Sequence, residues 1–75
     1  MKTVKIIIER GKDNYASYSE NVEGVYGSGD SAEEAKQNAL EAIELLKKYN
    51  EDENIPLILK GNYEVVYEFI TKSNL

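Results

Sequence analysis

The 75-residue chain contains no cysteine and no histidine. Without cysteine it has no disulfide, no thiolate nucleophile and no sulfur ligand for a metal. Without histidine it lacks the commonest general base of enzymes, and neither a Ser-His-Asp triad nor a histidine-based zinc centre is possible. These absences favour a protein that is not an enzyme and that holds no cofactor and no metal.

Long hydrophobic runs and an excess of basic charge are also missing. The longest apolar run lies around Val4 and residues 6–8 and is interrupted by Lys5, far short of the ~20 residues that span a bilayer. We see no signal peptide, and we therefore expect a cytoplasmic protein with no membrane contact. The net charge is −5, from 14 acidic and 9 basic residues. Direct binding of nucleic acid is accordingly not expected, whereas an acidic surface suits a basic protein partner or simply keeps the protein in solution.

The composition that remains, 41% apolar and 31% charged residues, is that of a globular protein, and its length is that of a single domain over residues 1–75. Strands are predicted where β-branched and aromatic residues alternate with polar ones, at residues 3–9, 15–19, 25–29 and 63–70. In the first of them, Val4, Ile6 and Ile8 should point to the same side. Pro56 separates the last strand from the preceding helix.

A helix is predicted to begin after Ser31, because Ser31 and Glu34 have the spacing of a capping box. The hydroxyl of Ser31 should accept a hydrogen bond from a free backbone N–H, and the carboxylate of Glu34 should accept one from the backbone N–H of Ser31 itself. The apolar positions that share a helical face are Ala35, Ala39, Ala42, Ile43 and Leu46. We therefore predict an α+β fold of order β-β-β-α-β: a three-stranded antiparallel meander, one helix packed on the sheet, and a fourth strand.

Glycines precede the helix at positions 24, 27 and 29. Their spacing is not that of a dinucleotide-binding or phosphate-binding loop. We interpret them instead as permitting a tight turn and close packing of the third strand against the alanines of the helix. One catalytic alternative stays open, in which Glu9, Asp30 and Glu64 meet at neighbouring strand ends and hold magnesium.

Six tyrosines in 75 residues are the feature that composition explains least. Tyrosine combines an apolar ring with a polar tip and is enriched at protein interfaces. About half are expected to be partly buried core residues. The candidates for partner binding are the strand tyrosines and two acidic residues of the last strand: Tyr15, Tyr18, Tyr26, Tyr67, Glu64 and Glu68.

The order and spacing of residues 15–35 resemble those of HicB-like antitoxin domains. In that pattern a strand with an aromatic residue leads through a loop ending in glycine to Gly-Asp-Ser/Thr-x-Glu-Glu-Ala and an alanine-bearing helix. The residues that match are Gly24, Gly29, Asp30, Ser31, Glu33, Glu34 and Ala35. Residues 8–13 and 63–69 are also similar to one branch of this family, so the resemblance extends over most of the chain.

This resemblance implies a partly reduced ribonuclease H-like fold without catalytic acids, which acts as the toxin-binding half of a bacterial toxin–antitoxin system. The implied partner is a small, basic HicA-type ribonuclease, inhibited by occlusion. The DNA-binding C-terminal domain common in the family is not expected within these 75 residues. The competing hypothesis is a self-associating module, a homodimer formed through an edge strand at residues 4–9 or 63–70.

Overall fold

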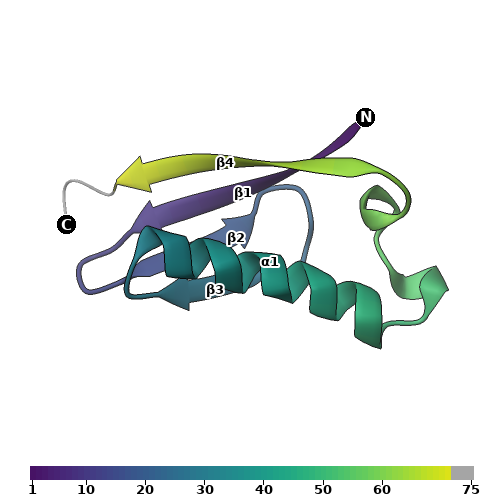
Figure 1. The fold of residues 1–75 in the computed structure, drawn as a ribbon, viewed down its shortest axis with the longest axis horizontal. Helices are drawn as coiled ribbons and strands as arrows, with labels where there is room; N and C mark the ends of the chain where they lie inside the picture. The colour runs from purple at the N-terminus through teal and green to yellow at the C-terminus, as the bar shows by residue number, and fades with distance from the viewer. Residues whose placement is uncertain (72–75) are drawn as a thin grey trace.

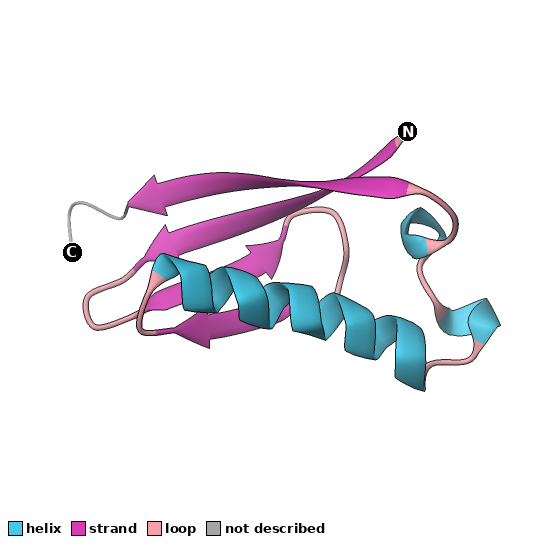
Figure 2. Cartoon of the chain, in the orientation of Figure 1, coloured by secondary structure: helices cyan, strands magenta, loops and turns pink. Residues whose placement is uncertain are grey.

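The structure is a computed structural model that describes residues 1–71 of the predicted 1–75 domain. Its elements are β1 (Lys2–Arg10), β2 (Tyr15–Ser19), β3 (Tyr26–Gly29), α1 (Ala32–Tyr49), two short 3-10 turns η1 (Asp52–Asn54) and η2 (Leu57–Leu59), and β4 (Tyr63–Thr71). The strands form one sheet of order β3-β2-β1-β4, with α1 on one side of it (Figures 1 and 2). The predicted α+β fold and its β-β-β-α-β order are confirmed.

The sheet is mixed, because β1, β2 and β3 form the predicted antiparallel meander whereas β4 lies parallel to β1. The register of β1 and β4 runs without interruption from Lys2 opposite Tyr63 to Arg10 opposite Thr71. The direction of β4 follows from the helix. After β3 has ended, α1 carries the chain back to the end of the sheet where β1 begins, and β4 then runs alongside β1 in the same direction.

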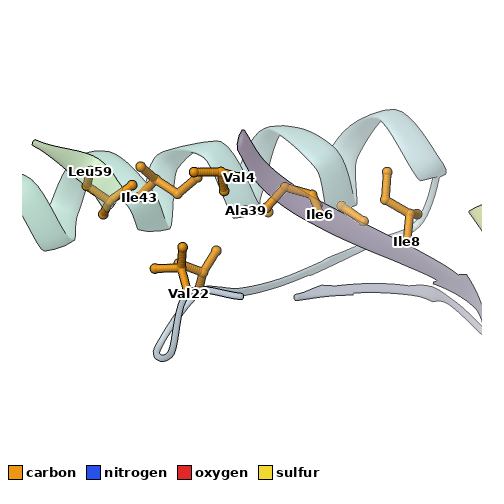
Figure 3. Close-up of a cluster of buried hydrophobic side chains, with 9 residues drawn as sticks. Val4, Ile6, Ile8, Val22, Ala39, Ile43 and Leu59 are labelled. Carbon is orange, nitrogen blue, oxygen red and sulfur yellow. The ribbon is translucent and has the colours of Figure 1, made fainter. Parts of the chain in front are cut away.

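The hydrophobic core lies between α1 and the sheet. Val4, Ile6 and Ile8 of β1 point to the helix and are fully buried, as their alternation predicts. The core contains Val4, Ile6, Ile8, Val22, Val25, Ala35, Ala39, Ile43 and Leu59, most of which are labelled in Figure 3. The burial of this apolar surface between the helix and the meander is the main contribution to the stability of so small a domain.

The helix approaches β3 closely because both surfaces carry small residues. A Cβ atom built on Gly27 would lie 2.7 Å from the backbone nitrogen of Ala39 and 3.0 Å from the carbonyl oxygen of Ala35. One buried hydrogen bond joins the layers: the hydroxyl of Ser17 donates to the carbonyl oxygen of Ala35 at 2.7 Å. The predicted packing of glycine against alanine is therefore present.

Ser31 caps α1, since its hydroxyl oxygen accepts from the backbone N–H of Glu34 at 3.1 Å. The return bond differs from the capping-box prediction. The carboxylate of Glu34 accepts from the backbone N–H of Asp30 at 3.2 Å, one residue earlier than the cap itself. The side chain of Glu34 packs against Gly29 at the end of β3, which directs its carboxylate to the residue that follows the strand.

Candidate interaction surface

The two sides of the sheet differ in what covers them. Within residues 1–71 all of the helical segments lie on one side or beyond one end of the sheet, and the other side, here called the open face, faces solvent (Figures 1 and 2). Side chains alternate along a strand, so this face carries the residues between those that face the helix. They are Thr3, Lys5, Ile7 and Glu9 of β1, Ala16 and Tyr18 of β2, Tyr26 and Ser28 of β3, and Glu64, Val66, Glu68 and Ile70 of β4.

A row of side chains crosses the middle of the open face. Tyr26 is opposite Tyr18, Tyr18 is opposite Ile7, and Ile7 is opposite Glu68. Tyr26 is 70% exposed, whereas Ile7 is only 2% exposed between its neighbours. The row thus presents an exposed aromatic ring at one edge, a buried aliphatic centre and a carboxylate at the other edge.

The charges of the open face are predominantly negative. Within residues 1–71 it carries the amine of Lys5 and the carboxylates of Glu9, Glu20, Glu64 and Glu68. The Lys5 Nζ atom lies 2.8 Å from Glu68 Oε1 and 3.5 Å from Glu20 Oε2. The hydrogen bond to Glu68 and the nearby charge of Glu20 raise the pKa of Lys5. These are exposed pairs and stabilise the fold little, so they leave the negative charge of the face available to a partner.

Tyr18 is held in place by an acidic neighbour on the adjacent strand. Its phenol donates a hydrogen bond to the carboxylate of Glu9, and this bond is the main cause that raises the pKa of Tyr18 above its ordinary value. Partial burial and the negative charges of Glu20 and Glu68 act in the same direction. The hydrogen bond orients the ring beside Ile7, a low-entropy arrangement of the kind that suits an interface.

The structure separates the six sequence-predicted binding residues into two groups. Tyr18, Tyr26, Glu64 and Glu68 are together on the open face. Tyr15 and Tyr67 are on the helix-facing side, where both are half-buried and pack against the core. The Nζ atom of Lys36 on α1 lies 4.6 Å from the centre of the Tyr67 ring. These two tyrosines therefore belong to the packing of the helix and not to this surface.

Other members of the open face were not among the predicted binding residues. Lys5 and Ile7 lie at its centre, and Glu20 adds a carboxylate next to Lys5. A signal for Ile7 was available in the sequence: it alternates with Ile6 and Ile8, so it must point away from the side that they share. That one apolar residue marks the middle of the uncovered side.

The geometry of the sheet excludes the magnesium site considered for Glu9, Asp30 and Glu64. Glu64 is opposite Thr3 near the start of β1, whereas Glu9 is opposite Ile70 near its end. Six residues of strand separate the two rows, which corresponds to about 20 Å. Among residues 1–71 there is no group of three histidine, cysteine or carboxylate side chains placed to hold a metal ion.

A shallow, mostly apolar hollow near the end of α1 is lined by Gly24, Ala42, Leu45, Leu46, Tyr49 and Asn50. The hollow carries few polar groups that could orient a ligand, so it does not compete with the open face as a site.

Within residues 1–71 no helix has both the length and the apolar character needed to cross a membrane.

Comparisons of the chain with protein-family models, with curated proteins and with solved structures gave no significant match. The function is therefore inferred from the residues of the chain and from their arrangement.

Proposed function

We propose that this domain is a non-catalytic protein-binding module whose open face binds a basic protein partner. The observation that carries the proposal is the combination on one uncovered side of the sheet: two adjacent tyrosines, Tyr18 and Tyr26, with four carboxylates and one amine within residues 1–71. Tyrosine rings supply contact area at low entropic cost, and complementary charge speeds and orients the encounter with a partner.

The sharper form of the proposal is an antitoxin of HicB type in a bacterial toxin–antitoxin system. Its partner is then a small, basic HicA-type ribonuclease, neutralised by occlusion, and both proteins act in the cytoplasm where the RNA substrate is found. Support comes from the similarity of residues 24–35 to the family pattern and from the sign of the charge on the open face. The domain requires no cofactor for such a role, because occlusion is a matter of contact.

The test is co-expression of the chain with a HicA-type ribonuclease from its own genomic neighbourhood, followed by host growth and co-purification. The expected result is restored growth and a stable complex. The variants Tyr26→Ala and Glu64→Lys should weaken rescue, since both side chains are exposed on the open face. Failure of the unaltered chain to rescue growth or to co-purify with the toxin would overturn the antitoxin proposal.

Control variants on the helix side make the experiment specific to the open face. Tyr49→Ala removes a tyrosine that is 72% exposed, close to the 70% of Tyr26. Glu41→Lys makes the same charge change as Glu64→Lys at an exposed position of α1. Both controls should rescue growth as well as the unaltered chain. An equal loss of rescue in the controls would show that the effect comes from net charge or expression level, and it would contradict the assignment of the open face as the binding surface.

A further inference from the structure

The two edges of the sheet are unlike each other. The β3 edge is four residues long and contains two glycines, whereas β4 is nine residues long and keeps an uninterrupted register with β1. The candidate edge at residues 4–9 is wrong, because β1 is an inner strand that pairs with both β2 and β4. Within residues 1–71 no strand pairs with the outer side of β4, which contains the other candidate, residues 63–70. Proteins usually protect such an edge by proline, a bulge, charged side chains, shortness or a covering element. Of these, β4 has only the charges of Glu64 and Glu68, and it has no proline and no bulge.

The helix does not cover this edge. It packs mainly on β3 and β2, and it reaches β4 chiefly through lysine side chains that lie over Tyr67 and Tyr63. Phe69, on the same side of β4, stays 65% exposed. A long edge strand that no other strand of residues 1–71 covers, with an exposed aromatic ring beside it, is the kind of surface that another strand extends.

We propose that two copies of this chain pair antiparallel through β4, with Tyr67 of each copy at the two-fold axis. In such a pairing the axis is perpendicular to the sheet, so residues at equal distances on either side of the central residue are opposite each other. Tyr67 is the midpoint of Tyr63–Thr71. This register is therefore the one in which all nine residues of the strand find a partner, and it joins two four-stranded sheets into one.

The strand is complementary to itself in this register. Val65 faces Phe69 of the second copy on the helix side, and on the open face Glu64 faces Ile70 while Glu68 faces Val66. A carboxylate is therefore never directly opposite another carboxylate. Moving the axis by one residue to Val66 places Glu64 opposite Glu68, which is unfavourable for like charges. This self-complementarity favours a second copy over an unrelated peptide as the occupant of the edge.

The interface does not depend on what binds the open face. Its backbone contacts lie at the outer side of β4, two strands away from β2 and three from β3, where Tyr18 and Tyr26 are located. A dimer of this kind doubles the open face and leaves both tyrosines of each copy accessible. Failure of the toxin experiment would therefore leave this proposal intact, and a monomeric chain would leave the open-face proposal intact.

The first test is the mass of the purified chain in solution by sedimentation equilibrium over a range of concentrations. The expected mass at high concentration is twice the 8.5 kDa of one chain. Phe69→Glu should return the mass to that of one chain, because it places a charge opposite Val65. Leu57→Glu is the control, since Leu57 is even more exposed at 78% and lies outside the strand. A monomer at millimolar concentration would overturn the proposal, as would a dimer unaffected by Phe69→Glu.

The second test reports the register and uses the absence of cysteine from the chain. Residues directly opposite in antiparallel strands have Cα atoms about 4.5–5.5 Å apart, which permits a disulfide. Oxidised Tyr67→Cys should therefore form a covalent dimer. In Phe69→Cys the two cysteines are separated by four residues along the strands, or about 13 Å, and should not cross-link. Cross-linking at position 69 but not at position 67 would contradict the register.

Discussion

Two neighbouring residues of β1 show how differently the two sides of the sheet are built. Ile6 faces α1 and Ile7 faces the open side, yet both are almost fully buried, at 0% and 2% exposure. Ile6 is covered by a helix that the fold holds in place. Ile7 is surrounded by surface side chains such as Tyr18 and Glu68, which are opposite it on the two adjacent strands. Equal burial therefore arises from a packed helix in one case and from side chains that themselves face solvent in the other.

This difference explains why the open face is the better candidate for binding. A partner can pack against the rings of Tyr18 and Tyr26 and cover Ile7 further without disturbing the core. The helix side offers no such contact, because Gly27 and Ser17 are already in close contact with α1. Substitutions at matched positions on the two sides measure the contrast directly.

The largest effect is expected from truncating Ile6. Ile6→Ala leaves a cavity between α1 and the sheet and should lower the free energy of unfolding by about 2–5 kcal/mol. Ile7→Ala should cost less than Ile6→Ala, because the side chains around Ile7 can collapse into the space. Urea denaturation followed by circular dichroism measures both. Equal losses would show that the open face is as firmly packed as the core.

A second comparison adds volume at adjacent residues of β3. Gly27→Val introduces atoms where a Cβ already lies 2.7 Å from the backbone nitrogen of Ala39, so the helix must move, at a cost of about 1–3 kcal/mol. Ser28→Val adds a β-branched side chain on the exposed open face and should be close to neutral. Thermal unfolding of the two variants decides the matter, and an equally stable Gly27→Val protein would refute the close approach of helix and strand.

Removing the hydrogen bond between the layers should have a smaller effect. Ser17→Ala loses the buried bond from the Ser17 hydroxyl to the carbonyl oxygen of Ala35 and should cost about 1 kcal/mol. Ser28→Ala on the open face removes an exposed hydroxyl and should cost nothing measurable. Both values come from the same urea titrations. A neutral Ser17→Ala would indicate that this bond does not contribute to holding the helix on the sheet.

The smallest effect concerns the ionisation of Tyr18 on the open face. Its hydrogen bond to Glu9 raises its pKa above the ordinary 10.0, so the folded protein holds the phenolic proton more tightly than the unfolded chain. The resulting small stabilisation is complete below pH 10.0 and is lost as the pH rises through the raised pKa. Phenolate absorbance of the protein, minus that of Tyr18→Phe, measures this titration.

Glu9→Gln tests the cause of that shift. Replacing the carboxylate with an amide removes its charge, so the pKa of Tyr18 should fall toward 10.0. Glu64→Gln is the control, because Glu64 is near the other end of the open face and does not contribute to the shift. A pKa of Tyr18 that is the same in the unaltered protein and in Glu9→Gln would exclude Glu9 as its partner.

The parts of the fold that sequence reasoning anticipated are those that depend on local rules. Tyr15–Ser19 was predicted with its observed bounds, and Ser31 is the N-cap because its hydroxyl serves a backbone group three residues away. The packing of Gly27 against the helix followed from the small residues at Ala35 and Ala39. In each case the contact that decides the structure is between residues close in sequence or between small residues whose sizes match.

What could not be predicted is the placement of elements that are distant in sequence. Alternation indicates that Tyr67 and Phe69 share a side of β4, but only the register with β1 shows that this side faces the helix. Leu40, which lies off the main helical stripe, packs against the core nonetheless. The separation of Glu9 from Glu64 likewise depends on the parallel pairing of β4, which no local pattern encodes.

The most direct test of the open face as a binding surface is calorimetric titration of a purified, catalytically inactive HicA-type ribonuclease with this domain and its matched tyrosine variants. The account predicts tight binding that weakens as salt is added, because opposite charges contribute. It also predicts at least a tenfold loss of affinity, about 1.4 kcal/mol, in Tyr26→Ala and no change in Tyr49→Ala. Undiminished binding by Tyr26→Ala together with loss of binding by Tyr49→Ala would place the interface on the helix side and contradict the account.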